Sequence, residues 1–322
     1  MKFLFFTDTH IRATNPVSRL DNYLETTKNK FLEVKDIIES NNIDFVLHGG
    51  DFFDRPDVPV KIVGEFANIL KSFNVPIYMI SGNHDIFGHN PITIERSMLG
   101  LLDTLGIVNI IEKDKPIILE RNNLKIQISG CPYVYDIDSE YKNYYFPEKL
   151  NDVDYHIFMI HSFLLDKPFL DTISHTLIDE VSDVDADIIL SGHYHTGFGV
   201  KKVNNKYFIN PGSLLRTNSS KPERARIPEV IILDLSKKNI LIEEIKLKTA
   251  KPGEEVLDIN SNIEKIGSEA LEEFKLLVRQ NAVLENYNVY EILKEISNKN
   301  NFPTSILEEA LKRLEEVEGN VN

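Results

Sequence analysis

Five short apolar runs, each leading directly into Asp, Asn or His, constrain this chain more than any other feature of its sequence. They cover residues 2–6, 44–48, 76–81, 156–160 and 187–190. Short runs of this kind, rich in β-branched and aromatic residues, are typical of strands that are buried on both faces. The runs therefore predict the central strands of an α/β fold.

Helical patterns separate several of these runs. Apolar residues recur at helical spacing across residues 20–38, 63–70 and 98–105. Strand–helix–strand alternation implies right-handed crossovers and a largely parallel sheet. Beyond about Leu119 the pattern becomes strand-like, with segments at 124–129, 207–209, 230–235 and 240–247. We expect a layered α/β core with two sheets.

The character of the sequence changes near residue 250. Residues 249–253 are followed by a strongly charged sequence with helical patterns. Ser261 with Glu264, and Ser305 with Glu308, have the spacing of a capping box at a helix N-terminus. We therefore predict a domain at residues 1–250 and a small C-terminal helical region at residues 251–322.

The composition excludes several classes of protein. The 322 residues are 42% hydrophobic and 27% charged, which is ordinary for a globular protein and excludes wholesale disorder. No apolar run approaches the roughly 18–20 residues that a membrane-spanning helix needs. Cys131 is the single cysteine and cannot form an internal disulfide, so we expect a reducing, cytoplasmic location. The net charge of −14 argues against nucleic-acid binding through bulk charge alone.

The polar ends of the five runs carry residues that commonly bind metals. In α/β sheets, ligands bind outside the carboxyl ends of the strands. The residues at those ends are Asp8, His10, Asp51, Asn83, His84, His161, His193 and His195. Each of them alone is readily explained as a turn former, a helix cap or a surface residue. Their occurrence together after five strands favours one metal site, because unrelated turns have no reason to select the same ligand types.

The ligand types narrow the chemistry. Carboxylate, imidazole and amide groups suit Mn²⁺, Fe²⁺ or Zn²⁺, and they are too many for one tetrahedral zinc ion. Two ions about 3.5–4 Å apart need a bridging anion, which an aspartate can provide, and such a pair activates water for attack on a phosphoester. His84 directly follows a predicted ligand, so we predict that it protonates the leaving oxygen as a general acid, with Asp85 orienting its ring.

Five motifs follow one another along residues 8–195. They are Asp8-Thr9-His10, Gly50-Asp51-Phe52-Phe53-Asp54, Gly82-Asn83-His84-Asp85, His161 and Gly192-His193-Tyr194-His195. This ordered set resembles that of the calcineurin-like metallophosphoesterases. The resemblance implies a four-layer α/β/β/α sandwich with a two-metal site. It implies that one ion is held by Asp8, His10, Asp51 and His195, and the other by Asp51, Asn83, His161 and His193. In this pattern Asp51 bridges the ions and His84 is the catalytic histidine.

The stretch from Leu47 to Pro59 resembles the corresponding part of SbcD, the nuclease subunit of the bacterial SbcC–SbcD complex, and of its archaeal and eukaryotic relatives. The turn at residues 210–213 is similar to one in the same group. The resemblance implies a Mn²⁺-dependent DNA exonuclease and endonuclease of recombination and repair, partnered with an SMC-like ATPase. It also implies a homodimer formed through residues 92–105. Asp54 departs from the pattern, because the family sometimes has histidine there.

Basic residues after the 210–213 turn are candidates for binding DNA. We predict that Arg216, Lys221, Arg224 and Arg226 contact phosphates, the alternative being a solvated loop. Arg55 either contacts phosphate or pairs with Asp57.

Four histidines lie outside the motifs. His48 precedes the Gly49-Gly50-Asp51 stretch and is a candidate to support the site from behind. His89, His156 and His175 are expected to be structural or exposed.

Two questions stay open at the level of sequence. The C-terminal helices form a reduced DNA cap, dock the coiled coil of the ATPase, or do both; the alternative is that they pack on one another and on the phosphoesterase domain. The leading function is a DNA nuclease, and the alternative is a small-molecule or nucleotide phosphodiesterase or a protein phosphatase. A catalytically silent scaffold is disfavoured, because every predicted ligand and His84 are present.

Overall fold

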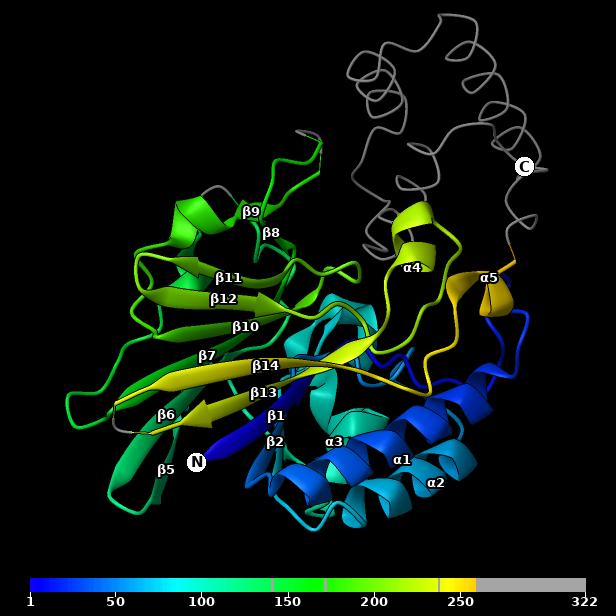
Figure 1. The fold of residues 1–322 in the computed structure, drawn as a ribbon, viewed down its shortest axis with the longest axis horizontal. Helices are drawn as coiled ribbons and strands as arrows, with labels where there is room; N and C mark the ends of the chain where they lie inside the picture. The colour runs from blue at the N-terminus through cyan, green and yellow to red at the C-terminus, as the bar shows by residue number, and fades with distance from the viewer. Residues whose placement is uncertain (140–141, 171–172, 237, 259–322) are drawn as a thin grey trace, which may run out of the picture.

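The computed structural model describes residues 1–139, 142–170, 173–236 and 238–258, so the helical region predicted beyond residue 258 lies outside the described part of the chain. The described residues form two six-stranded sheets that pack on each other, with the longer helices on one side (Figure 1). The expected layered α/β core with two sheets is confirmed.

The first sheet has a parallel centre and an antiparallel edge. Its order is β14 (Ile240–Lys246), β13 (Glu229–Leu235), β1 (Lys2–Phe6), β2 (Phe45–His48), β3 (Ile77–Met79) and β4 (Asn109–Ile110). Strands β1 to β4 are parallel, whereas β13 is antiparallel to both of its neighbours. Along β1, Phe3 and Phe5 point between the sheets while Leu4 and Phe6 point toward the helices, because successive side chains of a strand alternate between faces.

The second sheet also has a parallel centre, but an antiparallel strand lies at each of its edges. Its order is β11 (Gly199–Val203), β12 (Lys206–Asn210), β10 (Ile188–His193), β7 (Tyr155–Ser162), β6 (Leu124–Cys131) and β5 (Ile117–Arg121). The four central strands are parallel and the two edge strands are antiparallel to their neighbours. Both sheets therefore direct the carboxyl ends of their central strands to loops that can carry a site.

Three helices cover the outer face of the first sheet: α1 (Tyr23–Asn41), α2 (Val60–Lys71) and α3 (Met98–Thr104). The helix predicted from Leu20 begins at Tyr23, because the Asn22 side chain accepts a hydrogen bond from the Glu25 amide and caps the first turn. It ends at Asn41, and the capping residue Asn42 has a left-handed backbone with φ 52°.

The outer face of the second sheet is covered differently. A two-stranded ribbon, β8 (Leu164–Leu165) with β9 (Thr176–Leu177), and short 3₁₀ turns such as Ile178–Val181 pack on it. Among the described residues, this fourth layer has 3₁₀ turns where the implied four-layer pattern has α-helices. Pro132, Pro147 and Pro168 interrupt these connections, and proline does not fit a helix interior.

Two short helices lie near the end of the described chain, α4 (Lys221–Ala225) and α5 (Gly253–Val256). Leu257 forms an isolated β-bridge with Arg19, and the Asp258 amide donates to the Ser18 carbonyl at 2.8 Å. The segment 251–258 thus packs on the first domain, although the predicted boundary lies at residue 250. Across the part of the chain that the structure describes, no helix is long and apolar enough to cross a membrane.

Candidate metal centre

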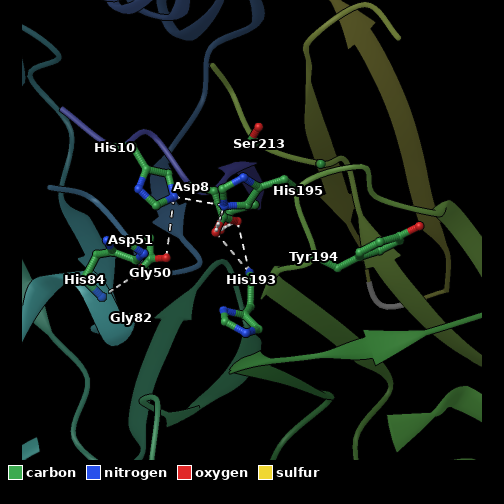
Figure 2. Close-up of polar contacts among 12 residues, drawn as sticks. Asp8, His10, Gly50, Asp51, Gly82, His84, His193, Tyr194, His195 and Ser213 are labelled. Carbon is green, nitrogen blue, oxygen red and sulfur yellow. Dashed lines mark hydrogen bonds and ion pairs between the residues drawn. The ribbon is translucent and has the colours of Figure 1, made fainter. Parts of the chain in front are cut away.

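The polar ends of strands from both sheets meet at one place. Asp8 and His10 follow β1, Asp51 follows β2, and Asn83 and His84 lie in the turn after β3, while His161 is in β7 and His193 ends β10. Figure 2 shows Asp8, His10 and His195 close together, with Asp51 and His84 beside them. The structure therefore brings together the residues that were predicted as metal ligands.

A first group of ligand atoms comes from Asp8, His10, Asp51 and His195. One ligand atom from each lies within 4.8 Å of the others, and all four residues are buried. The Nε2 atoms of His10 and His195 are 2.9 Å apart. Two ring nitrogens that face each other at this distance need a proton or a cation between them, because two lone pairs repel.

A second group consists of Asp51, His161 and His193, again within 4.8 Å. The His161 Nε2 atom lies 3.4 Å from Asp51 Oδ2 and 3.2 Å from Asn83 Oδ1. His161 Nδ1 is 2.8 Å from the Gly49 carbonyl oxygen, which can only accept, so Nδ1 carries a proton and Nε2 is the nitrogen that faces Asp51 and Asn83. Asp51 belongs to both groups, as the predicted bridging role requires.

Two glycines let these loops approach closely. A Cβ atom on Gly82 would collide with the Asp51 carboxylate, and one on Gly50 would collide with the His161 ring. Gly50 also has a left-handed φ of 100°, which glycine adopts without strain. Glycine is therefore required at these two positions because a larger residue would collide with the side chains of the site.

The charges of the cluster fit divalent cations. Burial by itself lowers the pKa of His10 and of His161, but hydrogen bonds and the neighbouring carboxylates outweigh it and raise both to about 9. Burial alone would raise the pKa of Asp51, yet the charges of His161 and His84 hold it well below its usual value. The site therefore attracts positive charge, and its oxygen and nitrogen donors are those that Mn²⁺, Fe²⁺ and Zn²⁺ accept.

His84 is held beside the first group. Its amide donates to Asp51 Oδ1 at 2.9 Å, and its ring packs edge-on against His10 with centroids 4.7 Å apart. Its Nδ1 atom is 2.9 Å from the Asp54 carbonyl oxygen. Since that oxygen can only accept, Nδ1 carries a proton and Nε2 is the nitrogen that can exchange one with a substrate.

The role predicted for Asp85 needs correction. Its carboxylate accepts from the amides of Phe52, Phe53 and Gly82 at 2.9–3.2 Å. It therefore joins the Asp51 loop to the His84 loop, and the carbonyl of Asp54, not Asp85, orients the His84 ring. Burial, followed by the charge of Asp51, raises the pKa of Asp85 to about 7.

Arg12 was missed at the level of sequence, and Asp54 was noted only as part of a motif, without a role. Asp54 Oδ1 lies 3.6 Å from His10 Nδ1, and Asp54 Oδ2 lies 3.1 Å from Arg12 Nη1. Arg12 stands two residues after His10, as His10 stands two after Asp8, and this spacing was the available signal.

The remaining histidines support the fold. His48 is fully buried, and its Nδ1 accepts from the Gly50 amide at 3.3 Å, which agrees with a supporting role behind the site. His156 is buried too, with Nδ1 toward the Asp185 carbonyl and Nε2 near Ser129 Oγ. His89 is half-buried against Tyr133, with ring centroids 5.6 Å apart. The half-buried His175 has Nδ1 2.7 Å from the Ile173 carbonyl.

The basic residues proposed to bind phosphate divide into two kinds. Arg216 is 2% exposed and donates to the carbonyls of Arg226 and Lys251. Arg226 pairs with the buried Glu223 and donates to the Ser213 carbonyl. We revise the prediction that these two arginines contact phosphates, because their guanidinium groups are used in hydrogen bonds to backbone carbonyls that hold residues 213–226 in place. Lys221 is exposed and Arg224 half-buried at α4, and they stay predictions.

Arg55 takes the second of the two options foreseen for it. Its guanidinium makes a two-point contact with Asp57, with Nε 2.7 Å from Oδ1 and Nη2 2.9 Å from Oδ2.

Comparison with known proteins adds independent findings. The chain is 40% identical over 91 residues to the DNA double-strand break repair protein Mre11 of Methanococcus maripaludis, covering 27% of this chain and 23% of that protein. It is 26% identical over 289 residues to the double-strand break repair protein MRE11 of Encephalitozoon cuniculi, covering 78% and 48%. It is 24% identical over 256 residues to the DNA double-strand break repair protein Mre11 of Methanosarcina mazei, covering 72% and 38%.

The chain thus aligns with less than half the length of each of these three relatives. The family model described as calcineurin-like phosphoesterase matches residues 1–197, a range that contains every predicted metal ligand. With two ligand groups that share Asp51, this match shows that the chain belongs to the calcineurin-like phosphoesterase family.

Proposed function

We propose that this chain is a metal-dependent nuclease that hydrolyses phosphodiester bonds of DNA during double-strand break repair. The observation that carries the proposal is the sharing of Asp51 by two buried ligand groups, with His84 next to one of them. The names of the relatives from archaea and a eukaryote support DNA as the substrate.

The residues of the chain divide the work. Divalent cations, when held by the two groups, supply the charge that offsets a phosphodiester and lower the pKa of a water. The Asp54 carbonyl holds the proton on His84 Nδ1, so that in the imidazolium form the second proton, on Nε2, is the one transferred to the departing oxygen. Asp85 keeps the loops of Asp51 and His84 in register.

The finer points belong to the same proposal. Mn²⁺ is the ion we propose, because carboxylate, imidazole and amide donors suit it. The partners we propose are an SMC-like ATPase of the SbcC type and a second copy of this chain. The relatives' break-repair names support the first, and exposed apolar residues described below support the second.

The test is digestion of linear duplex and single-stranded DNA by the purified chain with Mn²⁺. We expect cleavage by the wild type, and a loss of about 100-fold or more in His84→Ala, since general acid catalysis contributes about 10²–10⁴-fold. His175→Ala is the matched control, because His175 lies outside the ligand groups, and it should cleave normally.

A second substrate separates the alternatives. If the wild type hydrolyses bis-p-nitrophenyl phosphate but not DNA, the metal site works and the DNA assignment is wrong. Hydrolysis of nucleotides or of phosphopeptides would then assign the chain to a small-molecule phosphodiesterase or to a protein phosphatase. Cleavage of DNA that survives in His84→Ala would contradict the role of this histidine.

A further inference from the structure

A positive charge stands beside His84 that the catalytic assignments above do not use. Backbone pairing continues past the ends of β1 and β2: the His10 amide donates to the Asp51 carbonyl at 3.0 Å, and the Asp54 amide donates to the Ile11 carbonyl at 3.1 Å. Ile11 and Phe53 also form a parallel β-bridge. This register places Arg12 next to Asp54.

The contacts of Asp54 connect Arg12 to the reacting end of the site. Arg12 Nη1 is 3.1 Å from Asp54 Oδ2, and Asp54 Oδ1 is 3.6 Å from His10 Nδ1. The Asp54 carbonyl oxygen is 2.9 Å from His84 Nδ1. The guanidinium group is therefore separated from both histidines by one aspartate.

The guanidinium has donors left for a ligand. The Arg12 side chain is 28% exposed, and its Nε and Nη2 atoms contact Thr14 Oγ1 at 3.3 and 3.1 Å. A guanidinium carries five N–H groups, so each terminal nitrogen has a second N–H beyond these contacts. The group is at once oriented by Asp54 and open to solvent.

Three other arginines discussed above, Arg55, Arg216 and Arg226, are placed differently. Arg216 and Arg226 donate to backbone carbonyls within the fold. Arg55 binds Asp57 through both Nε and Nη2. Arg12 combines partial exposure with a direct link to the aspartate that orients His84.

We propose that Arg12 binds the backbone phosphate next to the one that is cleaved. This inference rests on the proposed function, because a neighbouring backbone phosphate exists only in a polynucleotide substrate. Divalent cations held by the two ligand groups would offset the charge of the cleaved phosphate, whereas the neighbouring phosphate lies beyond them and needs a cation of the protein. An arginine suits that role, since its planar fork matches two phosphate oxygens.

The experiment compares DNA with bis-p-nitrophenyl phosphate, which has one phosphate only. Arg12→Ala should raise KM for DNA about tenfold, as expected for one charge-assisted hydrogen bond, and the loss on DNA should exceed the loss on the ester. The slope of log KM against log salt should fall by about 1. Arg12→Lys should recover part of the affinity, because it keeps the charge without the fork.

The matched control is Arg121→Ala. Arg121 also pairs with an aspartate, Asp44, but this pair lies at the opposite ends of the strands, just before β2. Its removal takes away one positive charge and one ion pair, and it should leave KM and the salt dependence for DNA unchanged.

A substrate variant tests the same contact without altering the protein. A neutral methylphosphonate linkage is placed one position to either side of the cleaved bond. On one side it should raise KM for the wild type about as much as Arg12→Ala does, with no further loss when both changes are combined.

The outcomes distinguish a failure of phosphate binding by Arg12 from a failure of the proposed nuclease function. Equal losses on DNA and on the ester, or an unchanged salt slope, would show that Arg12 acts only through Asp54 and would overturn this inference. Additive losses from the variant and the methylphosphonate would overturn it as well. A wild type that cleaves the ester but not DNA would instead overturn the proposed function.

Discussion

Several of the predicted metal ligands have strained backbones. Asp8, His10, Asp51 and His193 all have positive φ values, between 41° and 76°, which residues with a side chain rarely adopt. Each such residue costs on the order of 1–3 kcal/mol and persists only where neighbouring contacts hold it. Two kinds of contact hold them here. Backbone hydrogen bonds join the loops to one another, and the Asp8 carboxylate accepts a hydrogen bond from the His193 amide at 3.0 Å.

His48 leads to a prediction for the pH dependence of stability. Burial, followed by the charge of His161, lowers its pKa to about 3. Unfolding restores a value near 6.5, so the unfolded chain binds one more proton between these two values. The contribution of His48 to the free energy of unfolding is therefore fully present above about pH 6.5. It is lost as pH falls below that value, by about 1.4 kcal/mol per pH unit.

The measurement is urea unfolding of the wild type and of His48→Gln between pH 7 and 4. The wild type should lose stability more steeply, because the glutamine side chain of the variant takes up no proton in this range. Parallel curves would mean that His48 has the same pKa in the folded and the unfolded chain.

At the level of elements, helix α1 anchors the site to the first sheet. Its residue Phe31 packs against Phe6, Phe52, Phe66 and Phe73, with ring centroids 5.1–6.5 Å apart. Phe6 lies just before the Asp8 loop and Phe52 follows Asp51. The aromatic cluster thus fixes the two loops that carry these carboxylates.

Phe31→Ala should therefore lower the free energy of unfolding by about 3–5 kcal/mol, as is usual when a buried phenylalanine is truncated. The neighbouring Leu32 is 48% exposed, and Leu32→Ala, as the control, should change it by less than about 1 kcal/mol. Chemical unfolding of both variants checks the difference. Similar losses in the two would argue against a cluster centred on Phe31.

At the scale of the whole molecule, an apolar surface remains exposed around α3. Ile92, Leu101 and Leu105 are 83%, 40% and 62% exposed. Apolar groups gathered on one surface favour burial against a partner. The proposed homodimer would use this surface.

We expect the chain to be a dimer by light scattering and Leu105→Asp to be mainly monomeric, because a buried unpaired charge is costly. Leu241→Asp, at an equally exposed position on β14, is the control and should stay dimeric. A monomeric wild type would exclude the dimer.

The C-terminal region leads to a prediction about the ATPase. The described chain packs on the first domain as far as Asp258, so truncation after this residue keeps the buried Val256 and Leu257. We expect the truncated chain to lose co-purification with an SMC-like ATPase while it still hydrolyses bis-p-nitrophenyl phosphate. Binding that persists would place the docking surface within residues 1–258.

Local patterns predicted much of the fold and nearly all of the candidate site. The run at residues 2–6 coincides with β1, and those at 44–48 and 76–81 contain β2 and β3. Strand periodicity and helix caps act over a few neighbouring residues, which is why they can be read directly. The predicted ligands follow from the same reasoning, since they occupy the ends of these strands.

Contacts between distant segments decided the rest. Arg216 is buried because the carbonyls of Arg226 and Lys251, 10 and 35 residues away, accept its hydrogen bonds. Such distant partners cannot be predicted from a local sequence pattern. The pairing of Arg12 with Asp54 depends on the register between two loops, and the His84 ring turns to the Asp54 carbonyl for the same reason. Sequence by itself determined which residues reach the edge of the sheets. Only the tertiary structure decided which of their charges are used within the fold and which stay open to solvent.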